Sequence, residues 1–582
     1  MRSISPWRKH GPFAIFIAAL FILSYYLDQQ LSLVLPALHS ARILIQLALA
    51  ATVIAILRNV VGIRSFGTFS PVIIALSMIY TGLLLGLLLF AGVMLIMILT
   101  RATLHEQRIQ RSHRAAIMVL MVAMAATLLA AFATDLGRPE IAFVLLFPVV
   151  ITAWFADRYL EEVDKVGWGP PTRALLWTLV LVAAAYVVMV QDALVDTVMR
   201  EPVSWPLLVL LNWFLGTRVK VRLSERLRFG SMKRLEDVML QGGLSRTVLT
   251  INRRNAEYVS QYNPPEVMGS LNKARAKALM LAEGIPVPDN YLLVSRKEDV
   301  VEAVEVLLKS DSFALKPADG YGGEGIVVVS GREGDSYITG NSLLKLEDLL
   351  DHLGSILEGD YNKGMPDEAL VEALVRSHPS LKPIAPEGVP DIRVLCFRGY
   401  PVMTMLRLPT RQSDGKANLH MGAVGAGVEV STGLIRFATW MGELVERHPD
   451  TGAKLVGFQV PFWREVLEIA CEAQRATGLG FAGVDIVLDA ERGPLVLEVN
   501  RRPGLDIQKA NGCGLLPRLR AVEGLPTLEE PSEVRVLRAM EMDRHGWPAP
   551  ASLPPGGSIG GPRSIPGGPP VPSFAAGRRP FR

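Results

Sequence analysis

The stretch FALKPADGYGGEG, residues 313–325, decides how the carboxyl-terminal half of the chain folds. A short apolar run ends at Lys316, a glycine-rich turn follows, and residues 326–330 form a second run rich in β-branched side chains. Backbone N–H groups of such a turn can close over phosphate oxygens, because glycine has no side chain to interfere. The pattern predicts a phosphate-binding β-hairpin, unlike a Walker loop, where the glycines open a helix. The turn contains Gly320, Gly322, Gly323 and Gly325.

A second polar set follows in GPLVLEVNRRPG, residues 493–504. Strict alternation predicts that Val496, Glu498 and Asn500 share one face of a strand, and a neighbouring strand brings in Asp485. Two carboxylates and an amide oxygen form a hard, all-oxygen donor set that suits magnesium bound to nucleotide phosphates. The alternative is an exposed polar strand face without a ligand.

Taken together, these motifs resemble an ATP-grasp enzyme over about residues 254–519, and within that fold the α-L-glutamate ligase group. The motifs that carry the resemblance occur in order: Asn272-Lys273 before a helix, Lys316 with the glycine turn, the hinge segment 370–375, Asp391-Ile-Arg393, Asn418-Leu-His420, Asp485, and Glu498-Val-Asn500. The resemblance implies an α+β ATP-grasp domain that uses ATP and two magnesium ions.

The resemblance also implies a role for each matching residue. The hinge residues Glu372, Ala373 and Leu374 would hold adenine, and Asp391 would contact the nucleotide. Lys273, Lys316, Lys416 and Asn418 would lie near the phosphates, with Lys416 where the family has arginine, and Asp485, Glu498 and Asn500 would hold magnesium. Lys316 and Arg393 would neutralise charge during transfer. Arg407 and Arg502 would bind the acyl substrate or phosphate, with solvated arginines as the alternative.

The amino-terminal half is different in composition. The whole chain is 50% hydrophobic with a mean hydropathy of +0.30, and the surplus lies in residues 1–220. Crossing about 30 Å of hydrocarbon takes about 20 residues. Lipid offers no hydrogen-bond partners, so a single segment has to be a helix to satisfy its backbone N–H and C=O groups. The apolar runs cover residues 13–27, 43–57, 69–100, 115–133, 141–156, 174–190 and 203–215. They predict membrane helices; buried core helices of a large soluble protein are the alternative.

Charge sets the expected number of crossings. As one helix, residues 69–100 would rise about 48 Å, which exceeds the hydrocarbon thickness. Arg58 and Arg64 precede this run and Arg101 follows it, so the positive-inside rule requires two helices, split near residues 80–82. We therefore expect eight helices with both ends cytoplasmic, in the inner (cell) membrane. The first segment is interpreted as a retained anchor and not as a cleaved signal peptide.

The membrane half has a resemblance of its own. RNVVGIRSFGTF, residues 58–69, and LSERLRF, residues 223–229, are similar to a seven-helix bacterial module that is usually fused to an inactive transglutaminase-like domain. The loop over residues 28–40 is too short to hold such a domain. The resemblance implies a membrane module joined directly to a ligase-like partner.

The expected organisation is therefore multi-domain, an α-helical transmembrane bundle followed by an α+β ATP-grasp domain. The bounds are 1–229 for the bundle, 230–270 for a connecting segment, 271–525 for the ATP-grasp domain, 526–546 for a short helical extension and 547–582 for a disordered Pro/Gly-rich tail. A net charge of +4 excludes a chain-wide polyelectrolyte mode of nucleic-acid binding, and we expect no nucleic-acid partner. The three cysteines are too few for a disulfide scaffold.

These expectations converge on a membrane-anchored, ATP-dependent carboxylate–amine ligase. An acyl-phosphate intermediate would give an amide or peptide-like bond. The resemblance suggests glutamate as a substrate, and the acceptor would be a peptide, a cell-envelope precursor or a small amine. Two alternatives are a non-catalytic ATP-binding membrane sensor and a regulatory subunit of a transporter.

Overall fold

The computed structural model describes residues 6–31, 39–63, 65–79, 81–104, 111–135, 139–166, 168–225, 244–320, 325–340, 342–362, 365–526 and 530–547. The chain forms two compact units, Ser5–Ser231 and Met232–Arg582, which are described separately. Gly322, Gly323, Arg64 and the predicted tail beyond Trp547 lie outside the described residues.

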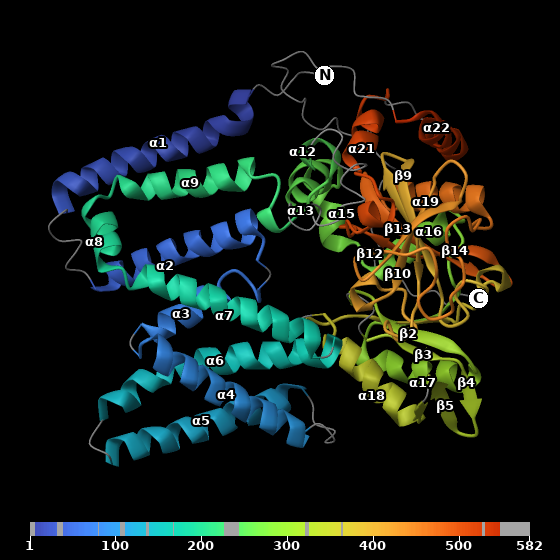
Figure 1. The fold of residues 1–582 in the computed structure, drawn as a ribbon. Coiled ribbons are helices and arrows are strands. Elements are labelled where there is room, and N and C mark those ends of the chain that lie inside the picture. Colours follow the sequence, from blue (N-terminus) through green and yellow to red (C-terminus); the bar gives the residue numbers. More distant parts are fainter. Residues whose placement is uncertain are drawn as a thin grey trace. The chain divides into compact units, whose positions relative to one another are not determined.

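The first unit is helical (Figure 1). Its helices are α1 (Pro6–Leu31), α2 (His39–Ile56), α3 (Ser70–Met78), α4 (Leu83–Leu104), α5 (Arg111–Asp135), α6 (Pro139–Val166), α7 (Gly169–Met189), α8 (Asp192–Arg200) and α9 (Ser204–Arg218). Within the described residues, three helices are long and apolar enough to cross a membrane: Ala41–Val61, Leu83–Leu104 and Pro171–Met189. Shorter apolar helices cover Ala14–Tyr26 and Ala116–Leu128.

The break between α3 and α4 lies where the charge pattern predicted it. Gly82, directly before the first residue of α4, has a φ of 76°, a left-handed conformation that suits glycine and separates the two helices. However, α3 has only nine residues and rises about 13.5 Å, which is less than half of the hydrocarbon thickness. Instead of presenting a lipid-facing surface it is largely buried against α7, α6 and α2. Eight crossings with cytoplasmic ends stay a prediction.

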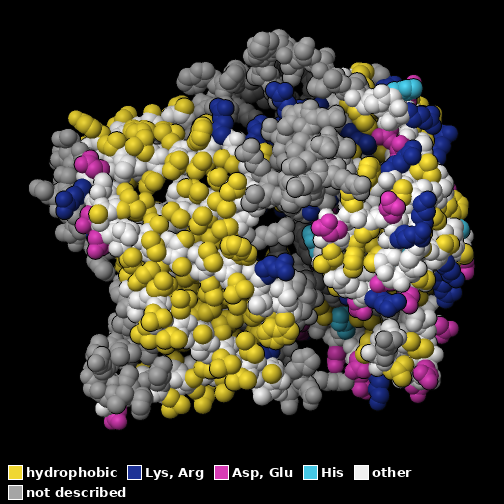
Figure 2. Space-filling model, viewed as in Figure 1, with side chains coloured by type: hydrophobic (Ala, Val, Ile, Leu, Met, Phe, Trp, Pro, Cys, Tyr) yellow, Lys and Arg dark blue, Asp and Glu magenta, His cyan; other side chains and the backbone are white. Residues whose placement is uncertain are grey.

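The outer surface of the helical unit is apolar. Leu84 is 76% exposed and Leu128 is 71% exposed, whereas Ile54 and Met97 are fully buried in the same unit. In Figure 2, hydrophobic side chains cover most of the visible face of this unit. Water would make such a surface unfavourable and a bilayer makes it stable, because each exposed apolar side chain meets lipid instead of water.

The second unit is α+β, and its described strands form three antiparallel sheets. A four-stranded sheet has the order β1-β7-β2-β3, a seven-stranded sheet has the order β12-β11-β10-β9-β8-β13-β14, and β4-β5-β6 form a small meander. The strands are β1 (Asn290–Val294), β2 (Phe313–Pro317), β3 (Val327–Val329), β4 (Gly331–Glu333), β5 (Ser336–Thr339), β6 (Ser342–Leu344), β7 (Ala369–Ala373), β8 (Asp391–Phe397), β9 (Tyr400–Leu408), β10 (Val424–Val428), β11 (Ile435–Trp440), β12 (Glu443–Leu444), β13 (Phe481–Asp489) and β14 (Gly493–Asn500). Phe313 of β2 pairs with Val329 of β3, as expected for a hairpin around the glycine turn.

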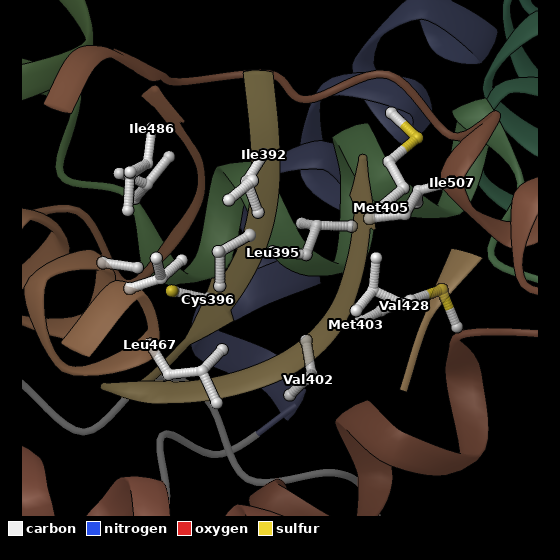
Figure 3. Packing of buried hydrophobic residues seen from close by; sticks show 14 of the residues in the cluster. Ile392, Leu395, Cys396, Val402, Met403, Met405, Val428, Leu467, Ile486 and Ile507 are labelled. Carbon is white, nitrogen blue, oxygen red and sulfur yellow. The ribbon is translucent and has the colours of Figure 1, made fainter. Parts of the chain in front are cut away.

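The helices of this unit cover its sheets. They include α12 (Leu244–Thr247), α13 (Ile251–Arg253), α15 (Pro265–Ser270), α16 (Lys273–Ala282), α17 (Val300–Lys309), α18 (Leu346–Leu357), α19 (Trp463–Ala476), α20 (Ile507–Ala510), α21 (Leu516–Glu523) and α22 (Ser532–His545). The main core lies on the seven-stranded sheet, where Ile392, Met405 and Ile486 pack together (Figure 3). The four-stranded sheet has its own core against α17 and α18.

Two segments expected to lie outside the α+β domain belong to its core. Leu249 and Tyr258, from the segment expected to be a connection, are buried with the residues of β8 and β13. Val536 of α22 is fully buried in the same core. Composition alone did not show this, because the apolar residues of these segments are sparse and acquire their partners only from distant strands.

Candidate functional site

Lys316 lies in a buried cluster on the four-stranded sheet. Ala314 pairs with Glu372 across β2 and β7, and two-residue periodicity therefore puts Lys316 and Glu372 on the same face. Lys316 Nζ forms an ion pair with Glu372 Oε1, and Lys277 Nζ of α16 donates to Glu372 Oε2 at 2.6 Å. All three side chains are at least nine-tenths buried. The hinge carboxylate therefore bridges two lysines.

Lys273 connects this cluster to the glycine turn. It begins α16, whose first turn is capped by Asn272 Oδ1, which accepts from Arg275 N at 2.8 Å. Lys273 Nζ donates to Gly320 O at 2.5 Å, so the helix start holds the start of the turn. Burial lowers the pKa of Lys273, the Glu498 carboxylate opposes that shift, and the Lys316 ammonium adds to it. Lys273 of α16 therefore lies within electrostatic reach of both Lys316 on β2 and Glu498 on β14.

The other end of the glycine turn is held by two residues that the sequence pattern did not indicate. Gly325 has a φ of 70°, and a Cβ at this position would lie 2.6 Å from the Tyr361 ring. His352 Nε2 lies 2.9 Å from Gly325 O, and Tyr361 O–H lies 3.2 Å from His352 Nδ1. Only glycine fits this backbone conformation and this contact, so the turn ends at a defined position.

The carboxylate set lies on β13 and β14. Asp485 of β13 lies opposite Glu498 of β14 in the strand register. Asn500 Nδ2 donates to Asp485 Oδ2 at 3.0 Å and to Glu498 Oε1 at 2.8 Å. The expectation that Val496 shares this face is wrong: a bulge shifts the register next to Asp485, Val496 pairs with Ile486, and both lie in the hydrophobic core. A bulge adds one residue to a strand and so interrupts the alternation.

Two arginines hold the carboxylates in place. Arg393 Nε and Nη2 donate to the two oxygens of Asp485 at 2.7 and 2.6 Å. Arg407 pairs with both oxygens of Asp391 and its Nη2 donates to Asp485 Oδ2 at 2.9 Å. Although burial raises the pKa of Asp485, the Arg393 and Arg407 guanidiniums lower it to about 2. Asp485 is therefore ionised at neutral pH, as a metal ligand must be.

The donor set fits magnesium in its chemistry. Oxygens of Asp485 and Glu498 converge on one amide group, that of Asn500, which places three oxygen-bearing side chains around a common point. Asn500 would have to present its amide oxygen in place of its NH₂ group, which requires a rotation of the side-chain amide. The set has only two carboxylates, and the described residues contain no group of three or more His, Cys, Asp or Glu that could hold a metal ion.

The hinge borders a pocket of about 190 Å³. Its lining includes Ser312, Ala373, Leu374, Arg376, Arg492 and Leu495. Ala373 and Leu374 therefore line this pocket, whereas the Glu372 side chain points to the lysines. The contact of Ala373 and Leu374 with adenine stays a prediction. Lys316, Asp485 and Glu498 are not part of the lining, so the pocket and the charged cluster are distinct parts of the site.

Of the remaining expected residues, Asp391 joins the carboxylate set through Arg407. Lys416 and Arg502 are exposed. Asn418 Oδ1 accepts from His420 N at 3.0 Å and caps the short helix Leu419–Met421. Asp391 is buried, and a nucleotide contact would have to share its oxygens with Arg407.

Sequence reasoning did not identify Lys277. A signal was available, because Lys277 follows Lys273 by four positions and so lies on the same face of α16. The spacing alone is common in exposed helices. The burial of Lys277 and its pairing with Glu372 distinguish it.

Comparisons with known proteins agree with this division of the chain. Residues 253–524 match the family described as sugar-transfer associated ATP-grasp, and residues 22–233 match the family described as seven transmembrane helices usually fused to an inactive transglutaminase. A relative named "Probable alpha-L-glutamate ligase" from Xanthomonas axonopodis pv. citri is 24% identical over 257 residues, which cover 44% of this chain and 65% of the relative. One of the same name from Stenotrophomonas maltophilia is 24% identical over 271 residues, 46% of this chain and 70% of the relative.

Parts of this chain are also similar to solved structures. The D-alanine–D-alanine ligase of Bacillus anthracis complexed with ATP shares 14% identity, with 49% of this chain and 70% of that chain covered and a TM-score of 0.26. The ATP-grasp ligase PsnB complexed with a minimal precursor shares 15% identity over 48% of this chain and 63% of that chain, with a TM-score of 0.26.

The described helices with apolar surfaces and the α+β unit correspond to the two family matches. The chain is a multi-pass membrane protein that joins a seven-helix, transglutaminase-associated module to a domain of the sugar-transfer associated ATP-grasp family.

Proposed function

We propose that this protein is a membrane-anchored, ATP-dependent carboxylate–amine ligase. The observation that carries the proposal is the pairing of two opposite charge clusters. Lys277 and Lys316 share one carboxylate, that of Glu372, and Lys273 lies within electrostatic reach of both Lys316 and Glu498. A magnesium–nucleotide complex has the complementary charges, because its phosphates are anionic and its metal prefers oxygen ligands.

In the proposed reaction a substrate carboxylate oxygen attacks the γ-phosphorus of ATP, the bond to the β,γ-bridging oxygen breaks, and ADP leaves. The amine nitrogen then attacks the acyl carbon of the acyl phosphate. The bond from that carbon to the phosphate oxygen breaks, inorganic phosphate leaves, and the nitrogen loses a proton. Catalysis of this kind rests on alignment and on neutralising charge that develops on phosphate oxygens.

The chain's own residues have separate parts in this scheme. Lys316 and Lys273 neutralise phosphate charge, and the glycine turn closes over the phosphates. Ala373 and Leu374 bind adenine through the hinge. Arg393 and Arg407 hold the carboxylates ionised and in position, and exposed Arg502 recognises the acyl substrate. Asp485, Glu498 and Asn500 would hold magnesium, which supplies neutralisation of the triphosphate when bound.

The substrate class is proposed from the comparisons. The relatives' name supports glutamate as one substrate, and the family's description, sugar-transfer associated, supports an amino sugar as the acceptor; a peptide and a cell-envelope precursor are the other candidates. The ATP-grasp domain faces the cytoplasm in this proposal, since ATP is made there and the basic flanks of the helices favour that side.

The test is acceptor-dependent ADP release by the full chain purified in detergent. We expect release with magnesium, ATP, glutamate and one member of a panel of a small amine, a peptide and an amino sugar. Lys316→Ala should reduce release at least about a hundredfold, because one electrostatic contact to the transferring group is worth this much. Lys309→Ala is the matched control, since Lys309 is an exposed lysine on α17. ATP binding without turnover for every acceptor would instead support a sensor.

A further inference from the structure

Lys277 pairs with the same carboxylate as Lys316, yet neither the glycine turn nor the carboxylate set includes it. Its ammonium is 2.6 Å from Glu372 Oε2, and its side chain is only 9% exposed. The other oxygen of Glu372 pairs with Lys316. A buried carboxylate that loses its cation is costly, by several kcal/mol in proteins. The ion pair with Glu372 therefore holds the Lys316 ammonium in place, and the second ion pair, from Lys277 to Glu372, determines how strong that hold is.

We infer that Lys277 is a positioning residue that frees Lys316 to bind phosphate, an inference that rests on the proposed ATP-binding function. When a polyphosphate arrives, Lys316 has to exchange a carboxylate oxygen for phosphate oxygens. With Lys277 in place, Glu372 keeps one ammonium partner after that exchange. Without Lys277, the exchange leaves Glu372 buried and unpaired, so Lys316 stays with Glu372 and phosphate binds more weakly.

The local charges support this role. Burial lowers the pKa of Lys277, Glu372 opposes the shift, and the Lys316 ammonium adds to it. Lys277 and Lys316 thus repel each other across a shared carboxylate, which weakens the hold of Glu372 on either one. Arg275, two positions earlier on α16, is exposed and lies on another face of the helix. It differs from Lys277 in burial while having the same charge.

The experiment is a double-mutant cycle read by calorimetric binding of ATP and of adenosine to the full chain in detergent. Lys277→Met should weaken ATP binding about tenfold, the size of one charge-assisted hydrogen bond, and leave adenosine binding unchanged. In a Glu372→Gln background the same substitution should have less than a twofold effect, because no carboxylate remains to be left unpaired. Lys277→Arg should keep ATP affinity within about threefold, since the charge remains.

Arg275→Met is the matched control and should bind ATP like the unmodified protein. Adenosine binding reports that each variant is folded. An equal loss of ATP affinity in both Glu372 backgrounds, or no loss in either, would overturn the inference, since Lys277 would then act only as a distant charge or not at all. If the unmodified protein bound ATP no more tightly than adenosine, the proposed function itself would fail, and the inference with it.

Discussion

The two sides of the candidate site use charge in opposite ways. Beside the four-stranded sheet, the ammonium groups of Lys277 and Lys316 share one carboxylate, that of Glu372, and Lys273 lies within electrostatic reach of Lys316, so positive charge is in excess. On the large sheet, Asp391, Asp485 and Glu498 lie with Arg393 and Arg407, so negative charge is in excess by one. If either half of the candidate site only stabilised the fold, each of its charged groups would have a partner of opposite charge, because a buried unpaired charge is costly.

This difference indicates what each side is built to accept. Lysines with a shared partner can exchange it for phosphate, whereas the bidentate arginines of the large sheet hold Asp485 in one orientation. The lysine side is therefore adaptable and the carboxylate side rigid. The following substitutions separate the two roles.

The largest expected effect is on turnover. Glu498→Gln removes one carboxylate oxygen from the proposed magnesium set while keeping the shape of the side chain. We expect acceptor-dependent ADP release to fall at least about a hundredfold and the magnesium requirement to rise. Glu465→Gln, an exposed change on α19, should leave both unaffected. Unchanged magnesium dependence in Glu498→Gln would remove this residue from the metal set.

The next effect is on stability. Asp485→Asn leaves Arg393 without its carboxylate partner in a buried site, which should cost about 3–5 kcal/mol of unfolding free energy. Glu498→Gln should cost less than about 1 kcal/mol, because Glu498 is only partly buried and accepts from the neutral Asn500. Thermal unfolding of the detergent-solubilised chain measures both. Equal losses of unfolding free energy in the two variants would mean that the ion pair between Arg393 and Asp485 does not stabilise the seven-stranded sheet.

A smaller effect separates backbone strain from packing at the glycine turn. Gly325→Ala should cost about 2–4 kcal/mol, since it combines a left-handed backbone with overpacking against Tyr361. Gly334→Ala is the matched control: its φ is 59°, but a Cβ there meets nothing within 4 Å. It should cost only about 1–2 kcal/mol. We also expect weaker ATP binding for Gly325→Ala alone. A cost as low as that of Gly334→Ala would show that Tyr361 yields to the new methyl group.

The smallest effect is a pH dependence. Burial lowers the pKa of both Lys273 and Lys277, so their ammonium groups are lost at a lower pH than that of an ordinary lysine, about 10.4. Positive charge disappears as pH rises, so ATP affinity should be lower at pH 9 than at pH 7. Adenosine affinity should not change. The decline should shrink in Lys277→Met, and an identical decline there would point to Lys273 alone.

Much of this arrangement could be predicted from local pattern. The apolar runs of the first unit, the break at Gly82, the β2–β3 hairpin and the helix that begins at Lys273 are each determined by residues close in sequence. Local signals of this kind are hydrophobic period, glycine in a left-handed turn and a side-chain cap. The length of α3 could not be predicted, because the apolar run that contains it, residues 69–100, continues into α4.

What local pattern could not provide is the identity of charge partners. Lys277 and Glu372 are 95 positions apart, and Arg393 and Asp485 are 92 apart. Nothing in a single segment says which of many arginines meets which aspartate. The bulge that turns Val496 into the core could not be predicted from one segment either, since it depends on the register between β13 and β14.

The amino-acid sequence by itself determined that one half of this protein is apolar, that the other half is α+β, and which residue types its site contains. The tertiary structure alone decided that Glu372 lies between two lysines and that two arginines hold Asp485. The physical reason is distance along the chain: hydrophobic period and turn preference act over a few residues, whereas electrostatic pairing depends on which strands and helices become neighbours.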